Sequence, residues 1–281
     1  MNIGLIGVGN IGMPLLKKLL KKKYNVSVLL EKNNNIFEKC LTFKENEIDN
    51  FINLNDKIIS VLPNSKITYD IVNNVKNNKK NKKYWMDLCS SCPKDVTKIS
   101  NKLLKNNIEY IDAPISGGPK GIINGNITSI ISGPENTFNI FNDIINIYSK
   151  KIFYVSDKVG TSSIIKLANN TLLAVNLIST AEIINILNKK DININKTLNF
   201  INNSSGRNWA TLQRYPDNIL TNKYDYGFSY ELHKKDVLTF IDNIDKINDN
   251  FLLTQVKNIY ENNNNKLSDN MDHTEIVKLI Q

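Results

Sequence analysis

The chain has 281 residues, is 41% hydrophobic and carries a formal net charge of +9 at pH 7. This length allows a large core or two domains, and the composition is compatible with a soluble globular protein. No apolar run approaches the roughly 18 residues of a membrane-spanning helix, so we expect no membrane partner. The chain begins directly with a predicted strand, which leaves no room for a targeting segment. We therefore expect a cytoplasmic protein, or an organellar one from which such a segment has been removed.

The positive charge raises nucleic acid as a partner. Much of the excess lies in Lys/Asn tracts such as residues 76–83, in which no arginine or aromatic residue is interleaved. Tracts of this kind are typical of solvated loops, whereas a nucleic-acid binder gathers its lysines on one face. We therefore expect no nucleic-acid partner.

Three cysteines, Cys40, Cys89 and Cys92, argue against the disulfide framework of a secreted protein, because the number is small and odd. Cys89-Ser-Ser-Cys92 has the spacing of a redox motif. However, no second pair offers zinc ligands and no tryptophan precedes the motif as in thioredoxins, so we interpret the spacing as incidental. We expect no metal, because the sequence shows no clustered His or Cys ligands.

The first half of the chain alternates short β-rich runs with amphipathic or polar segments, which predicts a doubly wound, mainly parallel sheet with helices. From Gly160 the periodicity becomes helical, and a first helix is predicted over 161–188. Apolar residues cover most of its circumference, so it should be buried in its own domain or against another subunit. The sequence thus predicts an α/β domain over 1–160 and an all-helical domain over 161–281. The predicted strands are 2–6, 25–30, 57–62, 84–88, 109–112, 127–132 and 152–155.

A glycine-rich turn, Gly7-Val-Gly9-Asn10-Ile11-Gly12, follows the first predicted strand and opens an amphipathic segment. Gly7 suits a tight turn, Gly9 lets the backbone approach a pyrophosphate, and Gly12 allows close helix packing. Because strand, turn, helix and second strand fit in one βαβ unit, the turn predicts a Rossmann dinucleotide site. We count Asn10 and Ile11, which lie between the glycines, as part of it.

The second predicted strand ends at Leu30-Glu31-Lys32, and Glu31 lies about 20 residues past the glycines, where a carboxylate binds the adenosine ribose. A carboxylate repels a 2′-phosphate, so NAD is favoured, although Lys32 keeps NADP possible. The alternative is that Glu31 is a surface charge at a strand end.

A Ser116-Gly117-Gly118 turn lies just beyond the strand that ends at Asp112. A hydroxyl and closely spaced backbone N–H groups at the carboxyl end of a strand suit a substrate carboxylate. An ordinary tight turn is the alternative.

Lys166 and Asn170 are four residues apart near the start of the long predicted helix, so both lie on one face. A lysine that faces a pocket can accept and return protons, since burial favours its neutral form. The alternative is a solvated lysine at a helix end.

The chain resembles the β-hydroxyacid dehydrogenase family over nearly its whole length. The resemblance implies a nicotinamide-dependent interconversion of a short β-hydroxy acid and its semialdehyde. The motifs that carry it, in the order of the family, are GLIGVGNIGMP (4–14), VLPNS (61–65), DLCSSCP (87–93), YIDAPISGG (110–118), VGTSSIIKLANN (159–170), SSGRNWA (204–210), GFSYELHKKD (227–236) and DHTEI (272–276).

The resemblance implies roles for individual residues. Lys166 would be the catalytic acid/base and Asn170 would help to hold the substrate, whose carboxylate the Ser116 turn would receive. Glu31 stands where the family commonly has an Asp or an Asn-Arg pair. An acidic side chain is therefore retained at this position, which favours NAD. The resemblance further implies that the dinucleotide is lined by Leu62, Pro63 and Ser90 and reached by Lys235, and that Trp209, Phe228 and Asp236 close the substrate site.

The motifs resemble two branches of the family that act on different substrates. SSGRNWA resembles the 3-hydroxyisobutyrate branch, our first choice, whereas GFSYELHKKD and DHTEI resemble the tartronate semialdehyde branch. A non-catalytic dinucleotide-binding protein is a remote alternative, because such a protein would be expected to lack the lysine.

Three further residues and the assembly complete the predictions. The resemblance places His233 and His273 outside the reacting centre. Arg207 could pair with a substrate carboxylate or form a structural ion pair. The long apolar helix predicts a homodimer or homotetramer.

Overall fold

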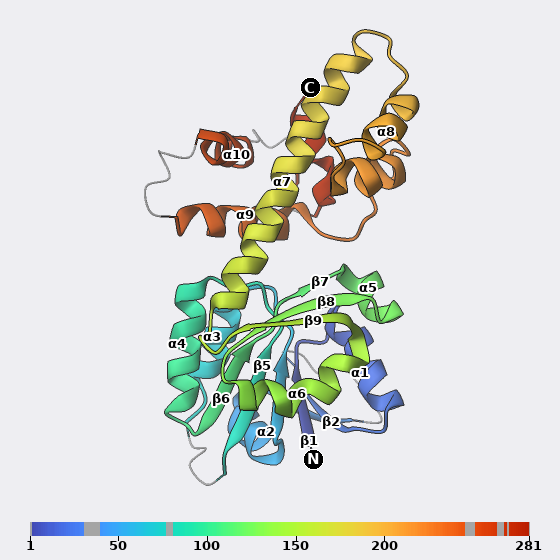
Figure 1. The fold of residues 1–281 in the computed structure, drawn as a ribbon. Coiled ribbons are helices and arrows are strands. Elements are labelled where there is room, and N and C mark those ends of the chain that lie inside the picture. Colours follow the sequence, from blue (N-terminus) through green and yellow to red (C-terminus); the bar gives the residue numbers. More distant parts are fainter. Residues whose placement is uncertain are drawn as a thin grey trace. The chain divides into compact units, whose positions relative to one another are not determined.

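The structure is a computed structural model that describes residues 2–30, 40–76, 81–244, 251–262, 267–268 and 270–280 (Figure 1). Internal contacts divide the chain into two compact units, Met1–Lys166 and Leu167–Gln281. The predicted boundary at residue 160 marks the start of helix α7 (Thr161–Asn188), which begins in the first unit and continues into the second. A domain boundary at that residue stays a prediction.

Nine strands of the described residues form one sheet in the first unit, in the order β3-β2-β1-β4-β5-β6-β8-β7, with β9 paired to β8. The pairs from β3 to β6 are parallel, and β8 runs antiparallel to β6 and β7. The doubly wound, mainly parallel sheet is therefore confirmed. The strands are β1 (Asn2–Ile6), β2 (Asn25–Leu30), β3 (Leu41–Lys44), β4 (Lys57–Ser60), β5 (Lys83–Asp87), β6 (Ile108–Asp112), β7 (Ile115–Ser116), β8 (Ile127–Ser132) and β9 (Ser149–Ser156).

All seven predicted strands are present, and those over 2–6, 25–30 and 127–132 have the bounds of β1, β2 and β8. The sequence missed β3 and β7. Strand β3 is largely exposed, so it lacks the apolar pattern by which strands are recognised. Strand β7 has only two residues and lies in a segment rich in Gly and Pro.

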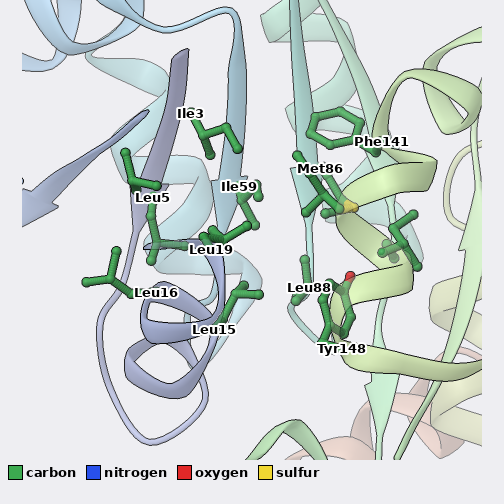
Figure 2. Close-up of a cluster of buried hydrophobic side chains, with 14 of the residues drawn as sticks. Ile3, Leu5, Leu15, Leu16, Leu19, Ile59, Met86, Leu88, Phe141 and Tyr148 are labelled. Atoms are coloured by element: carbon green, nitrogen blue, oxygen red, sulfur yellow. The ribbon is translucent and has the colours of Figure 1, made fainter. Parts of the chain in front are cut away.

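The helices of the first unit cover both faces of the sheet, because alternate residues of a strand point to opposite faces. Ile3 and Leu5 of β1 belong to a buried cluster with leucines of α1 and with Phe141 and Tyr148 of α6 (Figure 2). Ile6 instead belongs to a cluster formed with α2, α3 and α4. The helices are α1 (Gly12–Lys21), α2 (Ile48–Leu54), α3 (Ser65–Asn73), α4 (Pro93–Leu104), α5 (Gly118–Asn124) and α6 (Glu135–Tyr148), with a short 3-10 turn η1 (Glu45–Glu47).

Strands β6 and β7 follow one another along the same edge of β8. Asp112 at the end of β6 is opposite Ser132, and Ser116 at the end of β7 is opposite Thr128, in one continuous antiparallel register. The chain that leaves Asp112 is therefore held against β8 until it reaches the Ser116 turn.

In the described part of the second unit, the regular structure is helical, and a single bridge joins Ser229 and Asp272. Its core contains buried residues of every helix, among them Leu177 of α7 and Tyr260 of α10. The predicted all-helical C-terminal half is therefore confirmed. The elements that follow α7 are α8 (Ile194–Asn202), a π-helix η2 (Ala210–Ile219), α9 (Tyr230–Asp242), α10 (Phe251–Glu261) and a 3-10 helix η4 (His273–Leu279).

Helix α7 has the predicted bounds but is not buried all round. Ile165, Leu172, Ile183 and Ile186 are 41 to 60% exposed in the single chain, and their spacing places them on one face of the helix. One of the two expectations for this helix was burial within its own domain. That expectation is wrong for the exposed face.

Helix α7 is also the one helix among the described residues that is long and apolar enough to cross a membrane, with a mean hydropathy of 1.4 over its best window. No long apolar run marks this helix in the sequence, because polar residues interrupt every run. The core helix of a soluble protein meets the same criterion, and 44% of the window is buried inside the chain.

Candidate active site

The glycine turn between β1 and α1 has room for a ligand at one position only. Gly7 has a φ of 87°, and a Cβ there would lie 2.3 Å from the carbonyl oxygen of Val61. A Cβ on Gly12 would lie 1.9 Å from the carbonyl oxygen of Gly7, whereas a Cβ on Gly9 would meet no atom within 4 Å. The protein's own packing thus explains Gly7 and Gly12. Open space at Gly9 fits a dinucleotide whose pyrophosphate approaches the backbone there.

The start of α1 is equally open. Asn10 is exposed, and Ile11, the residue that precedes the helix, makes no side-chain hydrogen bond to its first turn. The N–H groups of a helix start that lack a side-chain cap can bind phosphate oxygens. The residues present therefore fit the dinucleotide predicted from the sequence. Glu31, the residue on which the preference for NAD over NADP rests, lies outside the described residues.

The residues expected beside the cofactor follow β4 and β5, which neighbour β1 in the sheet. Leu62 follows β4 and is half-buried, with its Cδ2 atom 3.1 Å from the position of a Cβ on Gly7. Pro63 beside it is exposed, and Ser90 follows β5 and is half-buried. Because β1, β4 and β5 are parallel, their carboxyl ends share one edge of the sheet, where ligands bind in folds of this class.

A buried carboxylate that the sequence did not indicate holds the start of the Ser90 loop. Oδ1 of Asp87 accepts hydrogen bonds from Ser60 Oγ (2.8 Å) and Cys89 N (3.1 Å), and Oδ2 accepts one from Tyr110 Oη (3.2 Å). Burial raises the pKa of Asp87 to about 6, against the effect of these hydrogen bonds, which lower it. In the sequence Asp87 appeared only as the first residue of the DLCSSCP motif, near the end of a predicted strand, with no role of its own.

The raised pKa of Asp87 predicts a pH-dependent stability. The folded state favours the neutral carboxyl, so its stabilisation is complete below the unfolded pKa of 3.8 and is lost as the pH rises through about 6. We expect Asp87→Asn, which cannot ionise, to gain about 2 kcal/mol relative to the wild type between pH 4 and pH 8, because the unfolded carboxyl is already partly ionised at pH 4. Urea unfolding at pH 4 and at pH 8 measures the difference in free energy of unfolding between the variant and the wild type, here called the gap. The matched variant Asp70→Asn, at an exposed position, should show a constant gap, and a constant gap for Asp87→Asn would contradict the prediction.

In the Ser116 turn, as in the glycine turn, a side chain would meet protein atoms at one glycine and open space at another. Gly117 has a φ of 131°, and a Cβ there would lie 2.9 Å from Cδ1 of Ile127. Gly118 has a φ of 62°, but a Cβ there would meet no atom within 4 Å. Both glycines adopt backbone conformations that L side chains rarely take, and the open side at Gly118 leaves the turn accessible to a small ligand.

Lys166 is buried, with 8% of its surface exposed, so it is not a solvated lysine at a helix end. Asn170, one turn further along α7, is 3% exposed. Both belong to the buried face of the helix together with Leu167. The face predicted from the spacing is therefore present, and it is the buried one.

Helix α9 contacts the Asn170 side chain through the carboxylate of Asp236. Nδ2 of Asn170 donates to Oδ2 of Asp236 (2.7 Å), and Nζ of Lys235 lies 3.0 Å from Oδ1 of the same carboxylate. Three residues predicted for the site are thus joined in the second unit.

His233, which was expected to lie outside the reacting centre, also contacts Asn170. Its Nε2 donates to the backbone carbonyl of Asn170 (3.0 Å), since a carbonyl can only accept. In the neutral ring Nδ1 is then the acceptor, and it receives the Tyr260 hydroxyl at 3.1 Å. His233 therefore holds the backbone of a candidate site residue. No spacing in the sequence indicated this contact.

Phe228 and Trp209 lie in different surroundings in the second unit. The ring centroid of Phe228 is 5.4 Å from those of both His233 and His273, so Phe228 is packed among rings. The pKa of His273 is lowered, chiefly by burial. Trp209 is 49% exposed, and the Arg214 guanidinium lies 5.9 Å from its ring.

Arg207 is exposed and lines a polar hollow of about 420 Å³ with Asn202, Asn203, Ser204 and Ser205. It forms no ion pair with any residue that the structure describes. Within the same described ranges, no group of three His, Cys, Asp or Glu residues could hold a metal ion, and none of the three cysteines forms a disulfide.

Two family models match successive parts of the chain. Residues 2–156 match the NAD binding domain of 6-phosphogluconate dehydrogenase. Residues 160–280 match the domain described as NAD-binding of NADP-dependent 3-hydroxyisobutyrate dehydrogenase. The first model alone covers more than half of the chain.

Individual relatives agree with these models. Mitochondrial 3-hydroxyisobutyrate dehydrogenase of Rattus norvegicus is 28% identical over 84% of this chain and 73% of its own length. The 2-(hydroxymethyl)glutarate dehydrogenase of Eubacterium barkeri is 28% identical over 84% of this chain and 79% of its own length. The structure of Mycobacterium tuberculosis 3-hydroxyisobutyrate dehydrogenase with L-serine has a TM-score of 0.84 and 18% identity, covering 100% of this chain and 99% of the other.

The glycine turn, the open helix start and the two family models agree on a dinucleotide-dependent enzyme. The family resemblance inferred from the motifs is confirmed, and so is NAD as the kind of cofactor. The chain belongs to the β-hydroxyacid dehydrogenase family, whose members are NAD-binding oxidoreductases.

Proposed function

We propose that the enzyme oxidises a short β-hydroxy acid, with 3-hydroxyisobutyrate as first choice, to its semialdehyde in a reversible NAD-dependent reaction. The observation that carries the proposal is the burial of Lys166 beside Asn170 on one helix face, because a buried lysine can work as a neutral base. Relatives named for 3-hydroxyisobutyrate at 28% identity support the choice of substrate.

The substrate is held by its carboxylate in the proposed reaction. The Ser116 hydroxyl and the N–H groups of the turn through Gly118 donate to the carboxylate, and Asn170 holds the substrate near the reacting carbon. Fixing the substrate in this way can lower the barrier by several kcal/mol, since it replaces a random encounter by an oriented one.

Lys166 carries the proton in the proposed chemistry. Its neutral amine accepts the hydroxyl proton while the carbon–hydrogen bond breaks and the carbonyl forms, and in reduction its ammonium returns a proton to the carbonyl oxygen. NAD, when bound, supplies the acceptor for the hydrogen and its electron pair. The residues that would hold NAD are Gly7, Gly9, Asn10, Ile11, Gly12, Glu31, Leu62, Pro63, Ser90 and Lys235.

Reduction of tartronate semialdehyde to glycerate is the second candidate, because GFSYELHKKD and DHTEI resemble that branch. The two segments are bonded to each other: the backbone N–H of His273 donates to the carbonyl of Phe228, and Asp272 Oδ2 accepts from Gly227 N at 2.8 Å. Trp209 and Phe228, which we propose to contact the substrate side group, would decide between the two substrates.

Initial rates on a panel of substrates test the proposed function. Purified enzyme is assayed with 3-hydroxyisobutyrate, glycerate and serine as donors, and with NAD and NADP in parallel. We expect the highest kcat/KM for 3-hydroxyisobutyrate with NAD. A preference for glycerate would select the second candidate, and no turnover with any hydroxy acid would favour a non-catalytic dinucleotide-binding protein.

We also propose that the enzyme is a homodimer or homotetramer, because the exposed face of α7 carries four large apolar side chains along one stripe. We expect Ile183→Asp to shift the wild-type oligomer toward monomer in size-exclusion chromatography with light scattering. Glu182→Ala, at an exposed neighbouring position, should leave the mass unchanged. A wild-type enzyme that runs as a monomer at micromolar concentration would contradict the proposal.

The cytoplasm is the location that we propose. The rat relative is mitochondrial, so the alternative is an organelle. Cell fractionation with an antibody against the enzyme decides between them.

A further inference from the structure

The first turn of α7 is bonded to the end of strand β6 through one buried carboxylate. Asp112 is 1% exposed. Its Oδ1 accepts hydrogen bonds from Gly160 N (2.9 Å) and Ser132 Oγ (2.7 Å). Its Oδ2 accepts three more, from Ser162 Oγ (2.5 Å), Ser163 N (3.1 Å) and Ser163 Oγ (3.0 Å).

None of these five donor groups carries a charge. A buried carboxylate is costly unless it is well hydrogen-bonded, and here hydroxyls and the N–H groups at a helix start supply the compensation. Ser132 completes the network by accepting from Ser162 N at 2.9 Å. Every oxygen of Asp112 is thus engaged, since its backbone carbonyl also accepts from Ser162 Oγ at 2.9 Å.

The network has a consequence for Lys166 because of where its members lie in the chain. Ser162 and Ser163 precede Lys166 by four and three residues, which places all three on one face of α7, and all three are buried. On its other side, Asp112 begins the segment that β8 holds in register as far as Ser116. One carboxylate therefore connects the helix that carries the proposed base with the strand that leads to the proposed carboxylate turn.

We propose that Asp112 is a positioning residue, which sets the orientation of Lys166 relative to the Ser116 turn by fixing the first turn of α7 to the end of β6. This inference rests on the proposed role of Lys166 as acid/base. Asp112 touches no reacting atom in this account and acts only through α7.

Asp112→Asn is the variant that tests the proposal. It keeps the size of the side chain, but either orientation of the amide places an NH2 group against a backbone N–H, that of Gly160 or that of Ser163. Hydroxyls can turn to accept a hydrogen bond, whereas an N–H cannot. The first turn of α7 should therefore move.

We expect Asp112→Asn to lower kcat by about 10- to 100-fold, the scale of a small misplacement of a reacting group. The Kd for NADH, measured by fluorescence, should change less than about twofold, because the network does not include the glycine turn. The primary deuterium isotope effect on kcat should rise as hydride transfer becomes slower. In hydrogen exchange, amides of residues 162–170 should exchange faster without any substrate present.

Thr161→Ala is the matched control. Its hydroxyl bonds Lys158 O at 2.9 Å in the same turn of the helix, away from Asp112, so kcat and exchange should stay at wild-type values. If Asp112→Asn does not fold, the double variant Ser162→Ala/Ser163→Ala removes two donors and keeps the charge, and the same measurements apply to it.

A loss of kcat with unchanged cofactor affinity and faster exchange in α7 would support the proposal. Wild-type kcat per folded enzyme, or a loss of activity that only follows the folded fraction, would overturn it. Lys166→Ala distinguishes failure of the proposed function from failure of the positioning role. If Lys166→Ala stays active, the proposed function fails. If Lys166→Ala is inactive while Asp112→Asn has normal activity, only the positioning role of Asp112 fails.

Discussion

Replacing Lys166 by alanine should lower kcat by about 100- to 10,000-fold, which is the usual contribution of a general acid/base. The affinity for NADH should be unchanged, because the proposed role of Lys166 is in proton transfer and not in holding the dinucleotide. The measurement is single-turnover oxidation of the preferred hydroxy acid, with cofactor affinity determined separately by fluorescence.

Two further variants separate proton transfer from charge. Lys166→Arg keeps a positive charge but cannot accept a proton, since a guanidinium stays protonated in proteins. It should therefore be as slow as the alanine variant. Lys158→Ala removes an exposed lysine shortly before α7 and should have wild-type rates.

Chemical rescue provides a further test of the proposed role of Lys166 in proton transfer. A small primary amine added to Lys166→Ala should restore part of the rate in proportion to its concentration, because the truncated side chain leaves space for it in a buried position. A near wild-type rate for Lys166→Ala without added amine would end the assignment of Lys166 as the acid/base.

Alanine at Gly9 and alanine at Gly12 should differ in their effects on folding and on cofactor binding. The Cβ of Gly9→Ala meets no protein atom within 4 Å, so its unfolding temperature should be that of the wild type. Its Kd for NAD should rise by about 10- to 100-fold, or roughly 1.4 to 2.8 kcal/mol, because the methyl group occupies the space proposed for the pyrophosphate.

Gly12→Ala should instead lose stability. Its Cβ would lie 1.9 Å from the carbonyl oxygen of Gly7, so the backbone must move, at a cost on the order of 1 to 3 kcal/mol. Thermal unfolding and cofactor titration of both variants check the pair. Unchanged NAD affinity in Gly9→Ala would show that the dinucleotide does not approach the backbone at that position.

The sequence predicted the parts of the molecule that depend on neighbours along the chain. Strands β1, β2 and β8 and helix α7 have their predicted bounds, because apolar periodicity is a local property. The glycine turn was equally clear, because its glycine spacing directly after a predicted strand is visible in the sequence and a positive φ, as at Gly7, favours glycine. The shared helix face of Lys166 and Asn170 follows from spacing alone.

The sequence could not predict contacts between distant segments. Asp87 and Asp112 each end a strand and look alike in the sequence, yet one holds the Ser90 loop and the other holds the first turn of α7. Their partners lie up to 51 residues away along the chain. Hydrogen-bond partners at such separations depend on the order of strands in the sheet, which periodicity does not contain.

The sequence by itself thus determined the fold class, the dinucleotide turn and the spacing of Lys166 and Asn170, because these depend on local conformation and on composition. Only the tertiary structure decided that Lys166 is buried, that His233 holds the backbone of Asn170, and that one face of α7 stays exposed. The physical reason is that burial and long-range hydrogen bonds are properties of packed elements, and packing exists only once the elements have assembled.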